Sequence, residues 1–85
     1  MQLIPSKRHE DRQLLDITFD RLIGSDVRLS GQSREFVPRW DSLGHVSLIL
    51  ELEKKLKRSF SVHQIESMNS YKAILKVLDL EDEKL

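Results

Sequence analysis

Apolar side chains recur with the period of an α-helix in three parts of the chain. The pattern in residues 10–23 predicts a first helix, which ends at the Gly24-Ser25-Asp26 turn signal. A second helix is predicted from Asp41 or Ser42 to about residue 57, a short helical turn at residues 62–66, and a last helix after Asn69 or Ser70. The buried stripes predicted for the first and last helices are Leu15, Phe19, Leu22 and Ile23, flanked by Leu14 and Ile17, and Tyr71, Ile74, Leu75 and Leu78.

The segment between the first two helices, residues 27–40, has no clear period. We expect a long loop there, and a loop of this length in a small domain is often functional. Four scattered apolar residues are expected to pin it to the core: Val27, Leu29, Phe36 and Val37. No alternating run predicts a strand. The predicted fold class is therefore all-α: a small four-helix bundle of three main helices plus one short helix, with a long first loop. Residues 1–85 form one domain, in which residues 1–9 are an extension with no assigned role.

The second helix carries apolar residues on two opposed faces. On a helical wheel, one group is Leu48, Ile49, Leu52 and Leu56, and the other is Leu43, Val46 and Leu50. One stripe is enough to bury a surface helix, and the charged residues of this helix argue against full burial. We therefore expect the second group to be a docking face for a partner. The alternative is that the long loop folds over Leu43 and Val46.

Composition narrows the possible chemistry. The chain has no cysteine, which excludes disulfides, thiolate metal sites and a cysteine nucleophile. Fourteen basic and fourteen acidic residues cancel, so nothing indicates a nucleic-acid surface. His45 is expected to be a partly buried structural histidine, and His9 and His63 to be solvated, so that neither a metal site nor a hydrolytic site is expected. Without a membrane-spanning run or a signal peptide, we expect a cytoplasmic protein that does not insert into membranes.

Ser42 is placed at the first turn of the second helix, directly after the N-cap candidate Asp41. A helix N-terminus that follows a loop is exposed, and its free N–H groups favour an attached anion. Taken alone, an Asp-Ser-Leu tripeptide is more often plain capping chemistry.

The wider pattern resembles the acyl carrier protein family. The stretch Trp40-Asp41-Ser42-Leu43-Gly44-His45-Val46, continued through residues 48–53 to Phe60, carries the resemblance, together with the long first loop and the short third helix. The resemblance implies a phosphopantetheine arm, taken covalently from coenzyme A, on Ser42, with Asp41 as its acidic neighbour. It implies partner contacts at Trp40, Leu43, Val46, Leu50 and Glu53. It also places Phe60, Ile65 and Met68 near the arm and the mouth of an acyl cavity.

The charge pattern differs from that of fatty-acid carriers, which are usually strongly acidic. This chain is neutral, and Gly44 and Ser47 occupy places that are often acidic. We therefore expect a specialised carrier, in a lipid, polyketide, nonribosomal-peptide or surface-saccharide pathway, rather than an enzyme. Its expected partners are a phosphopantetheinyl transferase and acyl- or aminoacyl-activating and acyl-transferring enzymes, and it is expected to be a monomer. An aminoacyl or peptidyl carrier, and an unmodified helical adaptor that docks through Leu43, Val46 and Leu50, are the alternatives.

Overall fold

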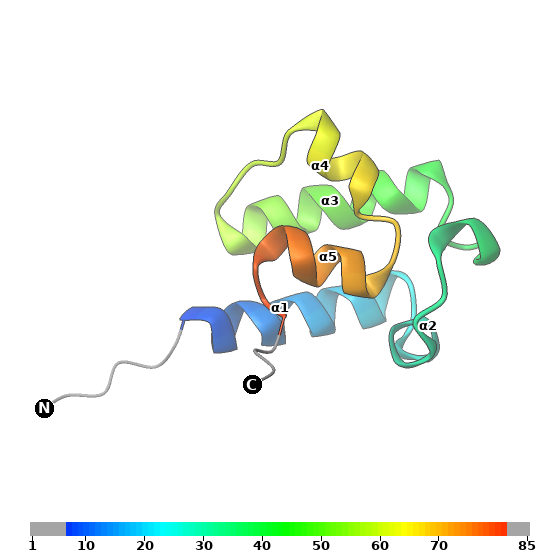
Figure 1. Ribbon diagram of the computed structural model, residues 1–85, viewed down its shortest axis with the longest axis horizontal. Coiled ribbons are helices and arrows are strands. Elements are labelled where there is room, and N and C mark those ends of the chain that lie inside the picture. Colours follow the sequence, from blue (N-terminus) through cyan, green and yellow to red (C-terminus); the bar gives the residue numbers. More distant parts are fainter. Residues whose placement is uncertain (1–6, 82–85) are drawn as a thin grey trace, which may run out of the picture.

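The computed structural model describes residues 7–81, and all regular structure in this range is helical. The helices are α1 (Lys7–Leu22), α2 (Ser25–Ser30), α3 (Ser42–Leu56), α4 (Val62–Ser67) and α5 (Tyr71–Leu78), with a short 3-10 turn, η1 (Arg34–Phe36). α3 runs back along α1, α5 lies beside both, and α4 crosses the top of the molecule (Figure 1). The all-α class and the predicted positions of the three main helices and of α4 are confirmed.

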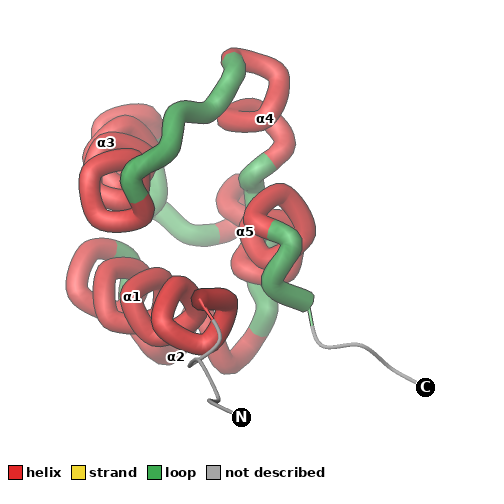
Figure 2. Tube along the Cα trace, turned by 90° about the vertical axis from the view of Figure 1, so that its left-hand side faces the viewer, coloured by secondary structure: helices red, strands yellow, loops and turns green. Residues whose placement is uncertain are grey.

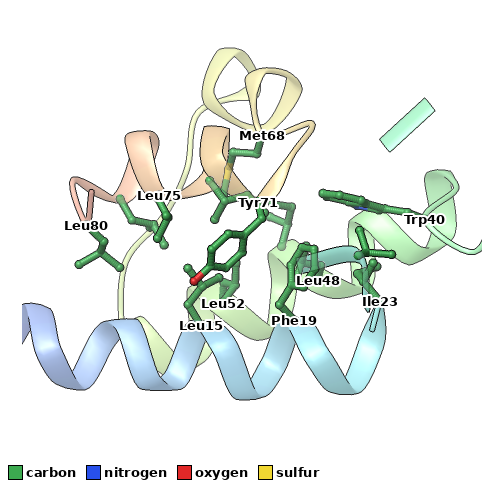
Figure 3. Packing of buried hydrophobic residues seen from close by; sticks show 14 of the residues in the cluster. Leu15, Phe19, Ile23, Trp40, Leu48, Leu52, Met68, Tyr71, Leu75 and Leu80 are labelled. Atoms are coloured by element: carbon green, nitrogen blue, oxygen red, sulfur yellow. The ribbon is translucent and has the colours of Figure 1, made fainter. Parts of the chain in front are cut away.

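The core lies between α1, α3 and α5, which surround it when the molecule is viewed almost along their axes (Figure 2). Phe19 is at its centre: the ring meets Trp40 edge-on at 5.2 Å between centroids and Tyr71 at 5.5 Å (Figure 3). The stripes predicted for α3 and α5 are buried, whereas the stripe predicted for α1 is confirmed only in part. Leu22 is half-buried against the core, and Ile17 is 60% exposed. The apolar residues buried from these helices, together with Ile23 directly after α1, are Leu15, Phe19, Leu48, Ile49, Leu52, Leu56, Tyr71, Ile74, Leu75 and Leu78.

Side-chain caps start the helices that follow loops. Ser70, rather than Asn69, caps α5 by accepting a hydrogen bond from the Ala73 N–H at 3.0 Å. α4 starts with a capping box, in which Ser61 and Gln64 each accept the other's backbone N–H. Because α4 has only six residues, these bonds matter more for it than for a long helix.

The long loop predicted at residues 27–40 is partly wrong, because two short helical segments, α2 and η1, lie in this region. Val27 and Val37 do pin the segment to the core, at 1% and 4% exposure. Leu29 and Phe36 do not, since they are 76% and 67% exposed. The cause is the geometry of α2: two residues along a helix turn a side chain by about 200°, so that Leu29 points away from the core when Val27 points into it.

An ion pair fastens α2 to α1. The Arg28 guanidinium donates to both carboxylate oxygens of Asp20, at 2.7 and 2.9 Å, and this pairing raises the pKa of Arg28. Gly31 ends the helix with φ 76°, a left-handed conformation that glycine adopts without strain. α2 therefore depends on one buried valine, one bidentate ion pair and one glycine.

Candidate functional site

Ser42 is the first residue of α3 and is exposed. Within residues 7–81, no hydrogen bond holds its hydroxyl group. The residues before it, 37–41, form a strap that links η1 to the start of α3. The hydroxyl is thus presented to solvent on a rigid element, between a helix and an anchored strap.

Asp41 caps α3, as predicted. Its Oδ1 accepts a hydrogen bond from the Gly44 N–H at 2.8 Å, and its backbone is extended, as an N-cap requires. A Cβ at Gly44 would lie 2.8 Å from the backbone oxygen of Arg39 and 3.3 Å from this Oδ1. Close approach of the strap therefore explains the glycine at this position.

Leu43, Val46 and Leu50 form a strip on the outer face of α3, which we call the apolar strip. These side chains are 76%, 53% and 60% exposed, while Leu48 and Leu52 on the opposite face are fully buried. The predicted opposition of two apolar faces is confirmed, and the alternative that the loop covers Leu43 and Val46 is wrong. Three exposed aliphatic residues at successive turns form the kind of surface that partners bind.

Trp40 does not belong to this exposed surface. Its side chain is 1% exposed, so the expected partner contact at Trp40 is wrong: the indole fills the core against Phe19 and anchors the strap instead. The Trp40 Nε1–H donates to Nδ1 of His45 at 3.0 Å, and the Arg34 Nε–H donates to the Trp40 carbonyl oxygen at 3.1 Å. The sequence pattern identifies the tryptophan but not the side to which it turns.

His45 links three parts of the site. It is 6% exposed, its Nδ1 faces Trp40, and its Nε2 lies 2.9 Å from the carbonyl oxygen of Ile65 in α4. Burial lowers the pKa of His45 below its ordinary value of 6.5, against the opposing effect of the hydrogen bond to Ile65, and the positive charge of Arg34 also lowers it. His45 was expected to be partly buried and is buried almost completely, while His9 and His63 are exposed, as expected.

The remaining expected residues lie on α3, on α4 and in the core. Glu53 is half-buried, and its Oε2 accepts from the Phe60 N–H at 2.8 Å, so that one carboxylate oxygen holds the loop after α3. Phe60 and Met68 belong to the core, at 8% and 0% exposure, and Ile65 packs against it. None of these residues lines the hollow described next.

An open hollow of about 550 Å³ lies beside Ser42. Its charged lining combines one cation, Arg34, with three carboxylates, Glu35, Asp41 and Glu66. The other lining residues are Ser33, Val37, Pro38, Trp40, Ser42 and Asn69. The Arg34 N–H donates to the Asn69 carbonyl oxygen at 2.7 Å and so ties η1 to the start of α5. Sequence reasoning missed Arg34, Glu66 and Asn69, because no periodicity or motif relates these positions.

Other kinds of site find no support in the part of the chain that the structure describes. Residues 7–81 contain no group of three or more histidine, aspartate or glutamate side chains placed to hold a metal ion. None of the described helices combines the length and the apolar character needed to cross a bilayer.

Comparisons with known proteins add no relative: no family model, curated protein or solved structure matches the chain. Fold and site together define a small all-α protein with an exposed serine at the start of a helix and an apolar strip beside it. Any assignment of function therefore depends on the geometry around Ser42.

Proposed function

We propose that this protein is a carrier of acyl thioesters, which holds its cargo on a phosphopantetheine arm attached to Ser42 and presents it to partner enzymes. The observation that carries the proposal is the Ser42 hydroxyl, which is exposed and unbonded within the described residues, one residue before the apolar strip. A carrier needs these two features side by side, because the enzymes that load and unload the arm must dock where it is attached.

The arm would arrive by transfer from coenzyme A. The Ser42 oxygen forms a new bond to the phosphorus that bears the pantetheine, the diphosphate bond of coenzyme A breaks, and adenosine 3′,5′-bisphosphate leaves. The transferase accepts the proton of the hydroxyl group. In this chain, Asp41 caps α3 and so fixes the helix that presents the hydroxyl, while the first backbone N–H groups of α3 favour the resulting phosphodiester anion.

The thiol that carries the cargo must come from the arm, because the chain contains no cysteine. The protein itself then needs no catalytic group, and its part is to display the arm and the apolar strip to successive partners. Since the chain carries no net charge, we expect those partners to rely on the apolar strip more than on a strongly basic surface. Binding should therefore respond weakly to added salt.

The test is a mass measurement. The purified full chain is incubated with coenzyme A and a transferase of broad specificity, and the gain in mass is compared with that of a single arm. Ser42→Ala should show no gain, while Ser59→Ala, which removes another exposed serine, should be modified like the natural chain. No gain in the natural chain with several transferases would contradict the carrier and favour an unmodified adaptor that docks through the apolar strip.

A second assay separates the two kinds of carrier. The modified protein is offered to acyl-activating and to aminoacyl-activating enzymes, and the thioester that forms is identified by mass. Loading with an amino acid alone would establish an aminoacyl carrier and contradict the acyl assignment.

A further inference from the structure

The strap before Ser42 is fastened by a chain of hydrogen bonds that runs through one imidazole ring. The indole Nε1–H can only donate, so Nδ1 of His45, 3.0 Å away, must accept. The proton of the neutral ring is then on Nε2, which donates to the Ile65 carbonyl oxygen at 2.9 Å. One neutral tautomer of His45 thus joins the strap, the first turns of α3 and α4.

We propose that His45 is the positioning residue of the attachment site: as a neutral ring it holds the strap that presents Ser42, and on protonation it releases that strap and slows the modification of Ser42. Protonation places an N–H on Nδ1, where it faces the indole N–H, and two donors cannot bond to each other. The link lost in this way lies two residues before Ser42. The inference rests on the proposed function only in naming Ser42 as the residue to be modified.

The charges around the ring favour the neutral form. Arg34 of η1 is the charged group whose field reaches His45, and it opposes protonation. From the strap, Arg39 pairs with Asp26 at 3.2 Å, and Asp41 accepts from the Gly44 N–H. On α4, Glu66 and His63 are exposed, and within residues 7–81 no carboxylate bonds to the ring. The release is therefore expected below the ordinary pKa of histidine, with burial as the main cause.

Nuclear magnetic resonance of the full, unmodified chain tests the release directly. The chain has a single tryptophan, so its indole N–H signal reports on the link without ambiguity. On titration from about pH 8 to about pH 4.5, the His45 ring, the indole N–H and the Ser42 amide should change with one common midpoint. A Ser42 amide that stays unchanged while the His45 ring titrates would overturn the proposal.

Rates of modification test the consequence, with every variant measured at each pH so that the pH response of the transferase cancels. The reference variant is His45→Asn, which keeps an acceptor near the Nδ1 position but cannot be protonated. At the acid end of the range, the natural chain should be modified about fivefold more slowly than this variant, because it has lost one hydrogen bond. His63→Gln, which replaces an exposed histidine, should behave like the natural chain.

Trp40→Phe keeps a large ring in the core but removes the indole N–H, and should be slow at every pH. Equal rates for the natural chain and His45→Asn at every pH would overturn the proposal and leave the carrier assignment intact. If no variant gains mass at any pH, the carrier assignment fails and the positioning role fails with it.

Discussion

At the scale of single residues, two polar side chains that are buried in the core have the clearest consequences. His45 and Thr18 are the buried polar side chains among the described residues, at 6% and 0% exposure. Both ring nitrogens of His45 have partners, whereas the Thr18 hydroxyl is buried without a hydrogen-bond partner within residues 7–81. The two residues therefore have opposite consequences: the first organises the site, and the second costs stability.

We predict that Thr18→Val stabilises the protein. Valine has the shape of threonine without the hydroxyl group, so the substitution removes a desolvated polar atom and leaves the packing unchanged. The expected gain is about 1 kcal/mol, and thermal unfolding should shift upward by about 4–8 °C. Thr18→Ser, which keeps the hydroxyl but removes a methyl group, should shift the midpoint downward. A lower midpoint for Thr18→Val would show that the hydroxyl has a partner after all.

At the scale of helices, the helices after α1 that could be predicted from the sequence are those with a capping side chain. α3 and α5 were predictable because each combines a capping side chain with a full apolar stripe, and both begin at the expected positions. α2 was not, because six residues with one buried valine contain less than two turns of periodicity. Its ion pair joins Arg28 to Asp20 across a turn, a contact that depends on how α1 and α2 meet in space.

For Asp41, the N-cap of α3, two substitutions distinguish its effect on stability from recognition of its charge by the transferase. Asp41→Ala removes the acceptor of the Gly44 N–H and should cost about 1 kcal/mol in the free energy of unfolding, measured in urea. Asp41→Asn keeps an acceptor at this position and should retain nearly all of the stability. If Asp41→Asn nevertheless lowers the rate of Ser42 modification, the negative charge of Asp41 is recognised by the transferase. Equal losses of stability in the two variants would contradict the capping role.

From the contact between α1 and α5 we predict that the protein loses stability at alkaline pH. The Tyr71 hydroxyl donates to Asp16 and accepts from the Arg12 Nε–H at 2.9 Å. Burial, together with the bond to Asp16, raises the pKa of Tyr71 from 10.0 to about 12. The unfolded chain loses this proton first, so the contribution to stability is complete below about pH 10 and declines as the pH rises towards 12.

Comparing Tyr71→Phe with the natural chain measures this effect. The urea midpoint of the natural chain should fall between about pH 8 and about pH 11 by more than that of Tyr71→Phe, which has no hydroxyl to ionise. Because the chain has one tyrosine, the ultraviolet absorbance of tyrosinate gives its pKa in the folded state without overlap. Tyrosinate that forms with a midpoint near pH 10.0 would contradict the coupling.

At the scale of the whole molecule, the exposed side chains of α3 could be predicted from the sequence, whereas the surroundings of Ser42 could not. The apolar strip follows from helical periodicity alone, since one helix cannot bury two opposite faces in a thin core. The direction of Trp40 arises from its contacts with Phe19 of α1 and His45 of α3. The hollow forms where η1 and the strap meet α3, α4 and the loop before α5. Contacts between separate elements leave no local pattern in the sequence, so only the three-dimensional structure reveals them.

A prediction about the apolar strip distinguishes docking at this strip from a general effect of surface hydrophobicity. Leu43 in the strip and Leu29 on α2 are the same residue type with the same exposure, 76%, and only Leu43 adjoins Ser42. Both Leu43→Gln and Leu29→Gln should leave the free energy of unfolding within about 0.5 kcal/mol of the natural value, because neither side chain is in the core.

Leu43→Gln should lower kcat/KM for modification of Ser42 by about 5- to 30-fold, the effect of losing about 1–2 kcal/mol of contact with the transferase, and Leu29→Gln should leave it unchanged. Equal losses in both variants would mean that overall surface hydrophobicity, and not the strip, draws the enzyme. Unchanged rates in both would mean that the transferase recognises the Ser42 region without contacting the outer face of α3. A loss confined to Leu43 would show that the outer face of α3 takes part in recognition next to the proposed attachment residue, Ser42.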